Sequence, residues 1–309
     1  MKIIITGGFG YLGTNLSNFL ADRGHDIRVF SRSKIMKTKM DDKYEVILGD
    51  ILNKRKISEA CKDIDFAIHL AALDQHNCKK NPELALRVNG IGTRIVLEAA
   101  KKLRVKRLIY MSTLQVYGKL RGKVTEQTLP IPINDYGLSK LLGEYYCMQA
   151  DNGMECAIAR LSNAYGPILT ASSENLVFNL FCKQSVEKQK IVLKSKGTQK
   201  RDFIAIYDVC QAIDKLLNSE LKGFRENIFN VGGENALSIR ESAELIAKTY
   251  FELYGKKVKI ELDKNPVEEQ TADFVYDISR IKKLGFRPKA KIKEEIKKTL
   301  MAFEQLKNG

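Results

Sequence analysis

The segment "TGGFGYLG", residues 6–13, constrains the fold more than any other stretch of this chain. It follows the apolar run "KIIIT" and precedes the amphipathic pattern "LGTNLSNFLADRG", as a turn between a strand and a helix does. Gly7 allows a tight turn, Gly10 lets backbone N–H groups approach a pyrophosphate, and Gly13 lets the helix pack closely. The helix N-terminus favours an anion. We therefore predict a dinucleotide site at this turn.

The first half of the chain continues this alternation of strand and helix patterns. The apolar runs "DIRVF", "EVILG", "DFAIHLA", "RLIYMS" and "ECAIARL" have the length of buried strands, and amphipathic stretches separate them. Such alternation predicts an α/β fold, namely a Rossmann-type doubly wound parallel sheet with helices on both faces. Ligands of such sheets bind at the carboxyl ends of the strands, near the point where strand order reverses.

After "NAYGP" the regular alternation lapses, and isolated strands such as "KIVLKS" and "KVKIEL" precede a Lys-rich terminal helix. We expect a smaller, mixed α/β C-terminal substrate domain here. Residues 1–166 would form the dinucleotide-binding domain, which would also receive elements from about residues 201–232. Residues 167–309 would form the substrate-binding cap, interleaved with it.

The composition of the chain bears on the kinds of ligand and partner that it can bind. Lys and Arg total 52 against 37 Asp and Glu, but few aromatic residues interleave with the lysines, so we expect a phosphate-bearing ligand and no nucleic acid. No apolar run approaches the ~18–20 residues of a membrane span. The N-terminus enters a strand directly, so we expect no signal peptide. Six scattered cysteines indicate reduced, buried thiols and a cytoplasmic location.

Histidine and cysteine spacing predicts no metal site. His69 ends a predicted strand and is expected to be packed and hydrogen-bonded. His25 and His76 are expected in a turn and a loop, respectively.

The end of the second predicted strand, "IRVFSRS", bears on the cofactor. An acidic residue there would bind a ribose 2′-hydroxyl, but Ser31 and Arg32 stand in its place, followed by Lys34 and Lys37. This cationic stretch favours NADP over NAD, and NAD remains the alternative. Asp50, after the third strand, is a candidate acceptor for the adenine amino group or a plain turn residue.

The stretch "DYGLSK" places Tyr136 and Lys140 one helical turn apart. A phenol of pKa ~10 is a poor acid or base at neutral pH, and a nearby cation lowers that pKa. The run "YMSTLQVYG" supplies Ser112 and Thr113 at a strand end, where a hydroxyl could complete a proton path to a substrate oxygen. Tyrosine, lysine and hydroxyl together indicate proton transfer beside the dinucleotide.

The motifs "TGGFGYLG", "HLAAL", "VNGIGT", "STLQVYG", "YGLSK", "RLSNAYGP", "KRDFIAIYDV" and "FNVGG" occur in this order from end to end. With them the chain resembles an extended short-chain dehydrogenase/reductase of the NAD-dependent epimerase/dehydratase family, which acts on nucleotide sugars. The resemblance implies that Tyr136 is the acid/base and that Lys140 holds the nicotinamide ribose and tunes the tyrosine. Thr113 would orient the sugar hydroxyl or ketone.

The same resemblance implies further roles. Asn89 would brace the cofactor region, Asn163 would lie near substrate and nicotinamide, and Arg201 would contact the substrate diphosphate, as a guanidinium does well. The substrate residues are thus Thr113, Asn163 and Arg201. The implied cofactor-binding residues are Gly7, Gly10, Tyr11, Leu12, Gly13, Ser31, Arg32, Asp50, Ile51, Leu70, Ala71, Ala72, Asn89, Tyr136 and Lys140.

Departures from the family pattern narrow the chemistry. Leu114 and Gln115 stand where dehydratases and decarboxylases of the family carry acidic residues, so we do not expect 4,6-dehydration. The segment "NPVEEQTADFVYDIS" lacks the arginine that many relatives place before the "DIS" residues, and Glu268 and Glu269 lie nearby, which leaves the second phosphate contact open.

Three functions remain. The preferred one is NADPH-dependent reduction of a 4-keto nucleotide sugar, with hydride transfer at a sugar carbon, C4. The alternative is a nucleotide-sugar 4-epimerase, and a non-enzymatic dinucleotide sensor is a further one. Apolar helices around residues 91–103 and 137–150 suggest a homodimer through a helix bundle, as is common in the family.

Overall fold

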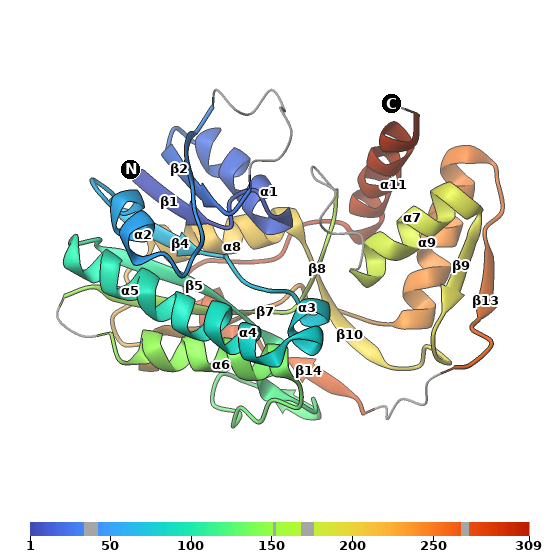
Figure 1. Ribbon diagram of the computed structural model, residues 1–309. Coiled ribbons are helices and arrows are strands. Elements are labelled where there is room, and N and C mark those ends of the chain that lie inside the picture. The colour runs from blue at the N-terminus through green and yellow to red at the C-terminus, as the bar shows by residue number, and fades with distance from the viewer. Residues whose placement is uncertain (34–42, 151–152, 168–175, 267–271, 309) are drawn as a thin grey trace.

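The computed structural model describes residues 1–33, 43–150, 153–167, 176–266 and 272–308. Its centre is a seven-stranded parallel sheet with the order β11-β7-β5-β4-β1-β2-β3 (Figure 1). The predicted doubly wound parallel sheet is therefore confirmed. Its strands are β1 (Lys2–Thr6), β2 (Asp26–Ser31), β3 (Glu45–Leu48), β4 (Phe66–His69), β5 (Arg107–Thr113), β7 (Glu155–Leu161) and β11 (Ile228–Val231).

The strand order reverses beside β1. The chain builds β2 and β3 on one side of β1 and then crosses to β4, β5, β7 and β11 on the other side. Because helices that leave β1 and β4 turn to opposite faces of the sheet, a crevice opens at the carboxyl ends of these two strands. The registers Thr6–Phe30 and Thr6–His69 bring those ends level with one another.

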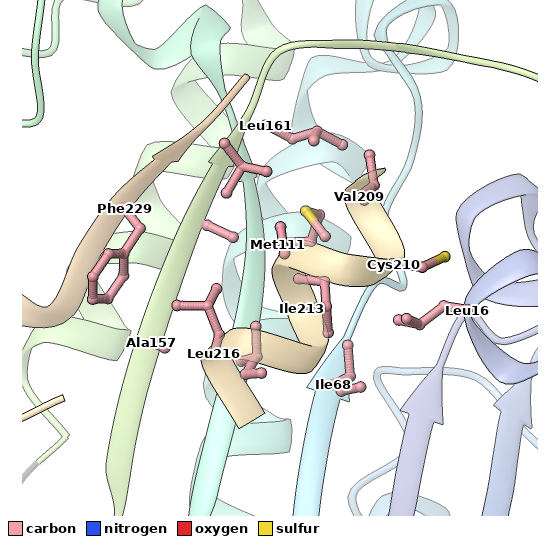
Figure 2. Packing of buried hydrophobic residues seen from close by; sticks show 14 of the residues in the cluster. Leu16, Ile68, Met111, Ala157, Leu161, Val209, Cys210, Ile213, Leu216 and Phe229 are labelled. Atoms are coloured by element: carbon pink, nitrogen blue, oxygen red, sulfur yellow. The ribbon is translucent and has the colours of Figure 1, made fainter. Parts of the chain in front are cut away.

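Helices cover both faces of this sheet, and each face forms its own apolar core. On one face α8 lies across the strands, and its Val209, Ile213 and Leu216 pack with Ile68 and Met111 (Figure 2). This face carries α1 (Tyr11–Ala21) and α8 (Ile206–Asn218). The opposite face carries α2 (Lys54–Ala60), α5 (Gly92–Lys102) and α6 (Asp135–Met148).

A smaller part with mixed strand directions adjoins the carboxyl edge of the sheet. In its three-stranded sheet, β10 pairs in parallel with β8 and antiparallel with β12, and Phe178 and Phe203 pack in its separate core. Ser162 alone separates β7 from β8, so the chain passes directly from the large sheet into the small one. The elements are β8 (Asn163–Tyr165), β9 (Lys190–Leu193), β10 (Lys200–Ala205), β12 (Asn235–Ser238), β13 (Lys259–Leu262), α7 (Val177–Lys188), α9 (Ile239–Tyr254) and α11 (Ile292–Asn308).

The expected mixed C-terminal part is thus present, while the exact division of the chain at residue 166 stays a prediction. Short elements complete the described structure, and β6 pairs with β14. These elements are β6 (Gly122–Val124), β14 (Phe274–Tyr276), the 3₁₀ turns η2 (Leu114–Tyr117) and η4 (Arg225–Asn227), and α10 (Ser279–Lys282).

Three short helical segments between β4 and α5 replace the loop expected there. Asp74 caps α3, because its carboxylate accepts the N–H of Asn77 at 2.9 Å. The expectation that His76 lies in a loop is therefore wrong, since His76 belongs to this helix. The segments are α3 (Gln75–Lys80), α4 (Pro82–Ala85) and the π-helical η1 (Leu86–Ile91). Among the described helices, none has both the length and the apolarity needed to cross a bilayer.

Candidate active site

A cavity of about 370 Å³ opens beside the glycine turn, at the carboxyl ends of β1, β2, β3 and β4. Gly7 adopts φ +69°, and a Cβ on it would lie 2.8 Å from the Ala71 N atom. A Cβ on Gly13 would lie 2.2 Å from the Gly7 carbonyl oxygen. Glycine is therefore required at both positions for the loop to follow this path, and the path fits the pyrophosphate-binding role expected of a dinucleotide loop.

Most of the residues expected to contact the cofactor line this first cavity. Arg32 is exposed at its rim, just after β2, and Asp50 accepts the N–H of Leu52 at 2.8 Å through Oδ1. Lys34 and Lys37 lie outside the described residues. The lining residues are Gly7, Phe9, Gly10, Phe30, Ser31, Arg32, Ser33, Gly49, Asp50, Ile51, Leu70, Ala71, Ala72, Leu73 and Val88.

A second cavity, of about 540 Å³, brings together residues from both parts of the molecule. Thr113 and Tyr136 from the large sheet and its helices face it, as do Asn163 on β8 and Arg201 on β10. Tyr11 and Leu12, expected as cofactor contacts, line this cavity and not the first. Its other lining residues are Asp74, Gln75, His76, Lys79, Met111, Ser112, Leu114, Gln115, Leu161, Ser162, Ala164, Leu176, Val177, Phe178 and Phe203.

Two side chains of this cavity, the hydroxyl of Thr113 and the phenol of Tyr136, are held at the end of β5 and at the start of α6. Thr113 is the last residue of β5, and its Oγ1 accepts the N–H of Gln115 at 3.2 Å. This contact occupies the oxygen and leaves the hydroxyl proton free to be donated into the cavity. Tyr136 lies in the first turn of α6, where Asn134 caps the helix by accepting the N–H of Gly137 at 2.8 Å.

Lys140 follows Tyr136 by one turn and is buried, so it lines neither cavity. Burial lowers the pKa of Lys140 to about 8, although the nearby Cys147, Glu144 and Cys78 act in the opposite direction. Its Nζ lies 4.2 Å from the centre of the Tyr110 ring, a cation–π contact that favours the charged form. Lys140 therefore remains mainly an ammonium group at neutral pH.

The pKa of the Tyr136 phenol is shifted in the opposite direction to that of Lys140. Burial, followed by the neighbouring Cys78 and Asp74, raises the pKa of Tyr136 above its usual value. Tyr136 is therefore a neutral phenol at physiological pH in this structure, and it can donate a proton. Abstraction of a proton would require a nearby positive charge, and in this structure the Lys140 ammonium group lies against the Tyr110 ring and does not contribute to the pKa shift of Tyr136.

His69 and Asn89 hold the region between the two cavities. Burial, followed by the Lys140 charge, lowers the pKa of His69 to about 3, so its ring is neutral. Because Thr93 donates its hydroxyl proton to the Asn89 carbonyl oxygen, we assign Nε2 of His69 as the donor to Thr93 Oγ1 at 3.0 Å and Nδ1 as the acceptor from the Thr6 hydroxyl at 2.6 Å. His69 is thus packed and hydrogen-bonded, as expected. Asn89 is also buried; it accepts the N–H of Leu73 at 2.7 Å and donates to Ser139 at 2.9 Å.

A buried polar network connects β5 and α6, the strand and the helix that carry Thr113 and Tyr136. Arg160 on β7 pairs with Glu144 on α6 at 2.7 Å, and Arg160 also donates to the Tyr117 hydroxyl at 2.9 Å. The Ser112 hydroxyl donates to the same Glu144 carboxylate. Tyr117 in turn donates to Asn230 on β11 at 2.6 Å. The network joins β5, α6, β7 and β11 immediately below Thr113, and so fixes the strand end and the helix relative to one another.

The small sheet carries two residues that the resemblance assigns to the substrate, Asn163 and Arg201, and main-chain contacts hold this region. The Asn163 side-chain amide donates to the Asp202 carbonyl oxygen at 2.9 Å, and the Asp202 carboxylate accepts the N–H of Gly233 at 2.9 Å. Asp202 therefore fixes the local backbone. Arg201, which precedes Asp202 on β10, lines the second cavity. Glu268 and Glu269 lie outside the described residues.

Sequence reasoning missed the α3 contribution to the site. Gln75, His76 and Lys79 all line the second cavity, and the signal that could have found them is the capping aspartate Asp74 before a short polar run. The six cysteines are free and buried. Within the described ranges, no three His, Cys, Asp or Glu side chains are grouped so as to hold a metal ion.

Residues 3–232 match the model of the NAD dependent epimerase/dehydratase family. The chain belongs to this family. It is 29% identical to a "Putative UDP-glucose 4-epimerase" of Methanocaldococcus jannaschii, over 96% of this chain and 97% of the relative. It is 27% identical to the UDP-N-acetyl-alpha-D-glucosaminuronate decarboxylase of Bacillus cytotoxicus, over 99% of both chains.

Among solved structures, the UDP-glucuronic acid 4-epimerase of Bacillus cereus, in complex with UDP-glucuronic acid and NAD, superposes with a TM-score of 0.84. It is 27% identical and the match covers 99% of this chain and 100% of that one. The resemblance stated from the sequence is thereby confirmed, and the chain is an NAD-dependent enzyme of the epimerase/dehydratase type. The comparisons do not specifically support the preferred reductase function or the preference for NADP.

Proposed function

We propose that this protein is an NAD-dependent 4-epimerase of UDP-sugars. The observation that carries the proposal is that Thr113 and Tyr136 line one cavity while no carboxylate follows Thr113, where Leu114 and Gln115 stand. The relatives named above support UDP as the nucleotide. The carboxylate of Asp74 also lines the cavity, but it is engaged in capping α3.

In the proposed mechanism Tyr136 accepts the proton of the sugar 4-hydroxyl and later returns it to the same oxygen. Thr113 donates a hydrogen bond to that oxygen and keeps it in line with the phenol. The Lys140 ammonium group would stabilise the phenolate form that Tyr136 has before it accepts this proton and after it has returned it. A nicotinamide ring, when bound, supplies the hydride acceptor and donor at C4. The glycine turn and the residues at the ends of β2 and β3 would hold the rest of that cofactor.

Epimerisation also requires the ketone to present its other face between the two steps. The second cavity has a volume of about 540 Å³ and extends from Tyr136 to Arg201 and Phe203 on the small sheet. This space supports a diphosphate that stays bound at Arg201 while the sugar turns. Asn163 would border the turning sugar.

An NADP-dependent 4-keto-sugar reductase is the second candidate, because Arg32 lines the first cavity at the end of β2. A guanidinium there would suit a ribose 2′-phosphate.

The two functions differ in whether reduced cofactor is consumed: a reductase consumes one NADPH for each sugar, and an epimerase consumes none. The test is to incubate the protein with UDP-glucose, UDP-glucuronate and their 4-keto derivatives, and to follow sugar configuration and reduced cofactor. Isomerisation without net cofactor consumption supports the epimerase, and stoichiometric consumption supports the reductase.

We also propose a homodimer through η1, α5 and α6. Leu138 and Tyr145 on α6 are 48% and 53% exposed, and Leu86 and Ile91 on η1 are 38% and 39% exposed. An apolar surface of this kind on neighbouring helices suits a second copy of the same surface. Analytical ultracentrifugation should report about twice the 35.0 kDa chain mass, and a 35.0 kDa species at micromolar concentration would contradict the dimer.

A further inference from the structure

Helix α3 forms the wall of the second cavity beside the reacting groups. Gln75, His76 and Lys79 of this helix line the cavity together with Thr113 and Tyr136. The mechanism proposed above uses none of the three. In Figure 1, α3 is drawn near β8 and β10, the strands whose Asn163 and Arg201 line the same cavity. The side chains that α3 presents therefore face whatever sugar is held at Tyr136.

A chain of three side-chain amides determines which end of Gln75 is free. Asn134 uses its oxygen to cap α6, so its Nδ2 faces the other way and donates to Gln115 Oε1 at 3.0 Å. Gln115 consequently presents Nε2 to Gln75 and donates to Gln75 Oε1 at 3.1 Å. The oxygen of Gln75 is thus engaged, and its Nε2 has no acceptor within the described part of the chain. The amide chain ends in a hydrogen-bond donor at the cavity wall.

Lys79 adds a positive charge next to this donor. It follows Gln75 by four residues, so both side chains lie on one face of α3. Its ammonium group makes no hydrogen bond or ion pair with any described residue, and it lines the cavity. Asp74 is the acidic residue of this wall, but its two oxygens accept from Asn77 N at 2.9 Å and from Asn77 Nδ2 at 2.8 Å. The wall therefore offers a donor and a cation to a ligand.

We propose that α3 selects a sugar bearing a carboxylate, so that the preferred substrate is a UDP-hexuronate held by Gln75 and Lys79. This inference rests on the proposed function. A carboxylate only accepts hydrogen bonds, and a donor beside an ammonium group satisfies it in both charge and geometry. The hydroxymethyl group of an uncharged sugar could accept a hydrogen bond from Gln75 Nε2. It would, however, displace water from the Lys79 ammonium group without supplying a negative charge to pair with it.

The position of α3 favours the sugar over the diphosphate as its ligand. Gln75 is bonded to Gln115, and the Gln115 N–H is bonded to Thr113 Oγ1, so α3 is fixed beside the hydroxyl that would bond the 4-oxygen of the sugar. Arg201, on β10 in the small sheet, is a separate cation of the same cavity and is suited to the diphosphate. Two cations on different walls match the two anionic groups of a UDP-hexuronate.

The test compares UDP-glucuronate with UDP-glucose in the NAD-loaded protein and three variants. Lys79→Gln removes the charge, and Gln75→Glu keeps the oxygen that accepts from Gln115 while replacing the donor with an acceptor. Lys80→Gln is the matched control, because Lys80 belongs to the same helix but does not line the cavity. We expect the first two variants to raise KM for UDP-glucuronate by about 10- to 100-fold, the size of one charge-assisted hydrogen bond. The kcat of both variants, the KM of Lys79→Gln for UDP-glucose and both constants of Lys80→Gln should change by less than about threefold, within the range of ordinary surface substitutions.

Three results would overturn the inference. The wild-type protein could favour UDP-glucose, or Lys79→Gln could raise both KM values equally. Lys79→Gln could also weaken the binding of UDP alone as much as that of UDP-glucuronate, which would assign α3 to the diphosphate. If neither sugar is isomerised, the proposed function fails, and calorimetric binding of both sugars then decides the inference separately. A preference for UDP-glucuronate that Lys79→Gln abolishes supports it, and no preference refutes it.

Discussion

Replacing Lys140 with Met should abolish catalysis and make the cofactor-free protein more stable at neutral pH. Lys140 is 2% exposed, and burial lowers its pKa to about 8. In the unfolded chain a lysine has a pKa of about 10.4, so below pH 8 the folded state holds a proton that it binds less favourably than the unfolded state does. A methionine of similar length fills the same space without this penalty.

The structure sets the size of the effect. A pKa lowered from 10.5 to about 8 corresponds to about 3 kcal/mol at pH 7, at about 1.4 kcal/mol per unit. The variant also loses the contact between the Lys140 ammonium group and the Tyr110 ring, which lowers the stabilisation by about 1–2 kcal/mol. The net stabilisation expected for Lys140→Met at pH 7 is therefore about 1–2 kcal/mol.

The pH dependence gives the sharper test. Since the folded pKa lies below the unfolded one, wild-type stability should rise with pH between about 8 and 10.4, where the unfolded chain still binds the proton. The gain from Lys140→Met should then shrink across this window. Urea unfolding at several pH values measures it, with Lys102→Met on the surface of α5 as the control. A variant that is less stable than wild type at pH 7, or a difference that is independent of pH, would refute the reasoning.

Three further outcomes are expected. Arg160→Met leaves the Glu144 carboxylate buried without its cation and should cost about 3–5 kcal/mol in urea unfolding, much of which the added change Glu144→Leu should restore. Tyr136→Phe should lower kcat by about 10²- to 10⁴-fold in the epimerisation assay while circular dichroism stays unchanged. Arg32→Ala should weaken NADPH binding more than NADH binding in fluorescence titrations, and equal weakening would remove Arg32 from cofactor selection.

The part of the fold and site that the sequence predicts is the part that local patterns encode. The glycine spacing requires a sharp turn between β1 and α1, and Tyr136 and Lys140 share one helical face at i and i+4. Strand-length apolar runs likewise predict the parallel sheet, because its strands are buried on both faces. In each case the residues that decide the structure are neighbours along the chain.

The remaining features depend on contacts between segments far apart in sequence. Lys79 and Arg201 line one cavity although 122 positions separate them, because β8 continues from β7 and then pairs with β10. Tyr11 directly follows the glycine turn as the first residue of α1, yet its hydroxyl donates to the Gly166 carbonyl oxygen at 3.2 Å and the residue lines the second cavity. No periodicity in a six-residue helix such as α3 indicates which of its side chains face inward.

Helix α6 relates these levels of organisation to the proposed chemistry. Tyr136, Lys140 and Glu144 follow one another at intervals of four, so they lie along one face of the helix. Tyr136 is only partly buried and meets the cavity, Lys140 is buried over Tyr110, and Glu144 is fully buried against Arg160 and Ser112. A buried ion pair contributes little net stability, but a shift of α6 by one residue would break it and leave two buried charges. The pair therefore restricts α6 to one register against β5 and β7. The placement of Tyr136 and Thr113 on one cavity depends on that register, and proton transfer in the proposed mechanism needs the two side chains to be held in a fixed relation.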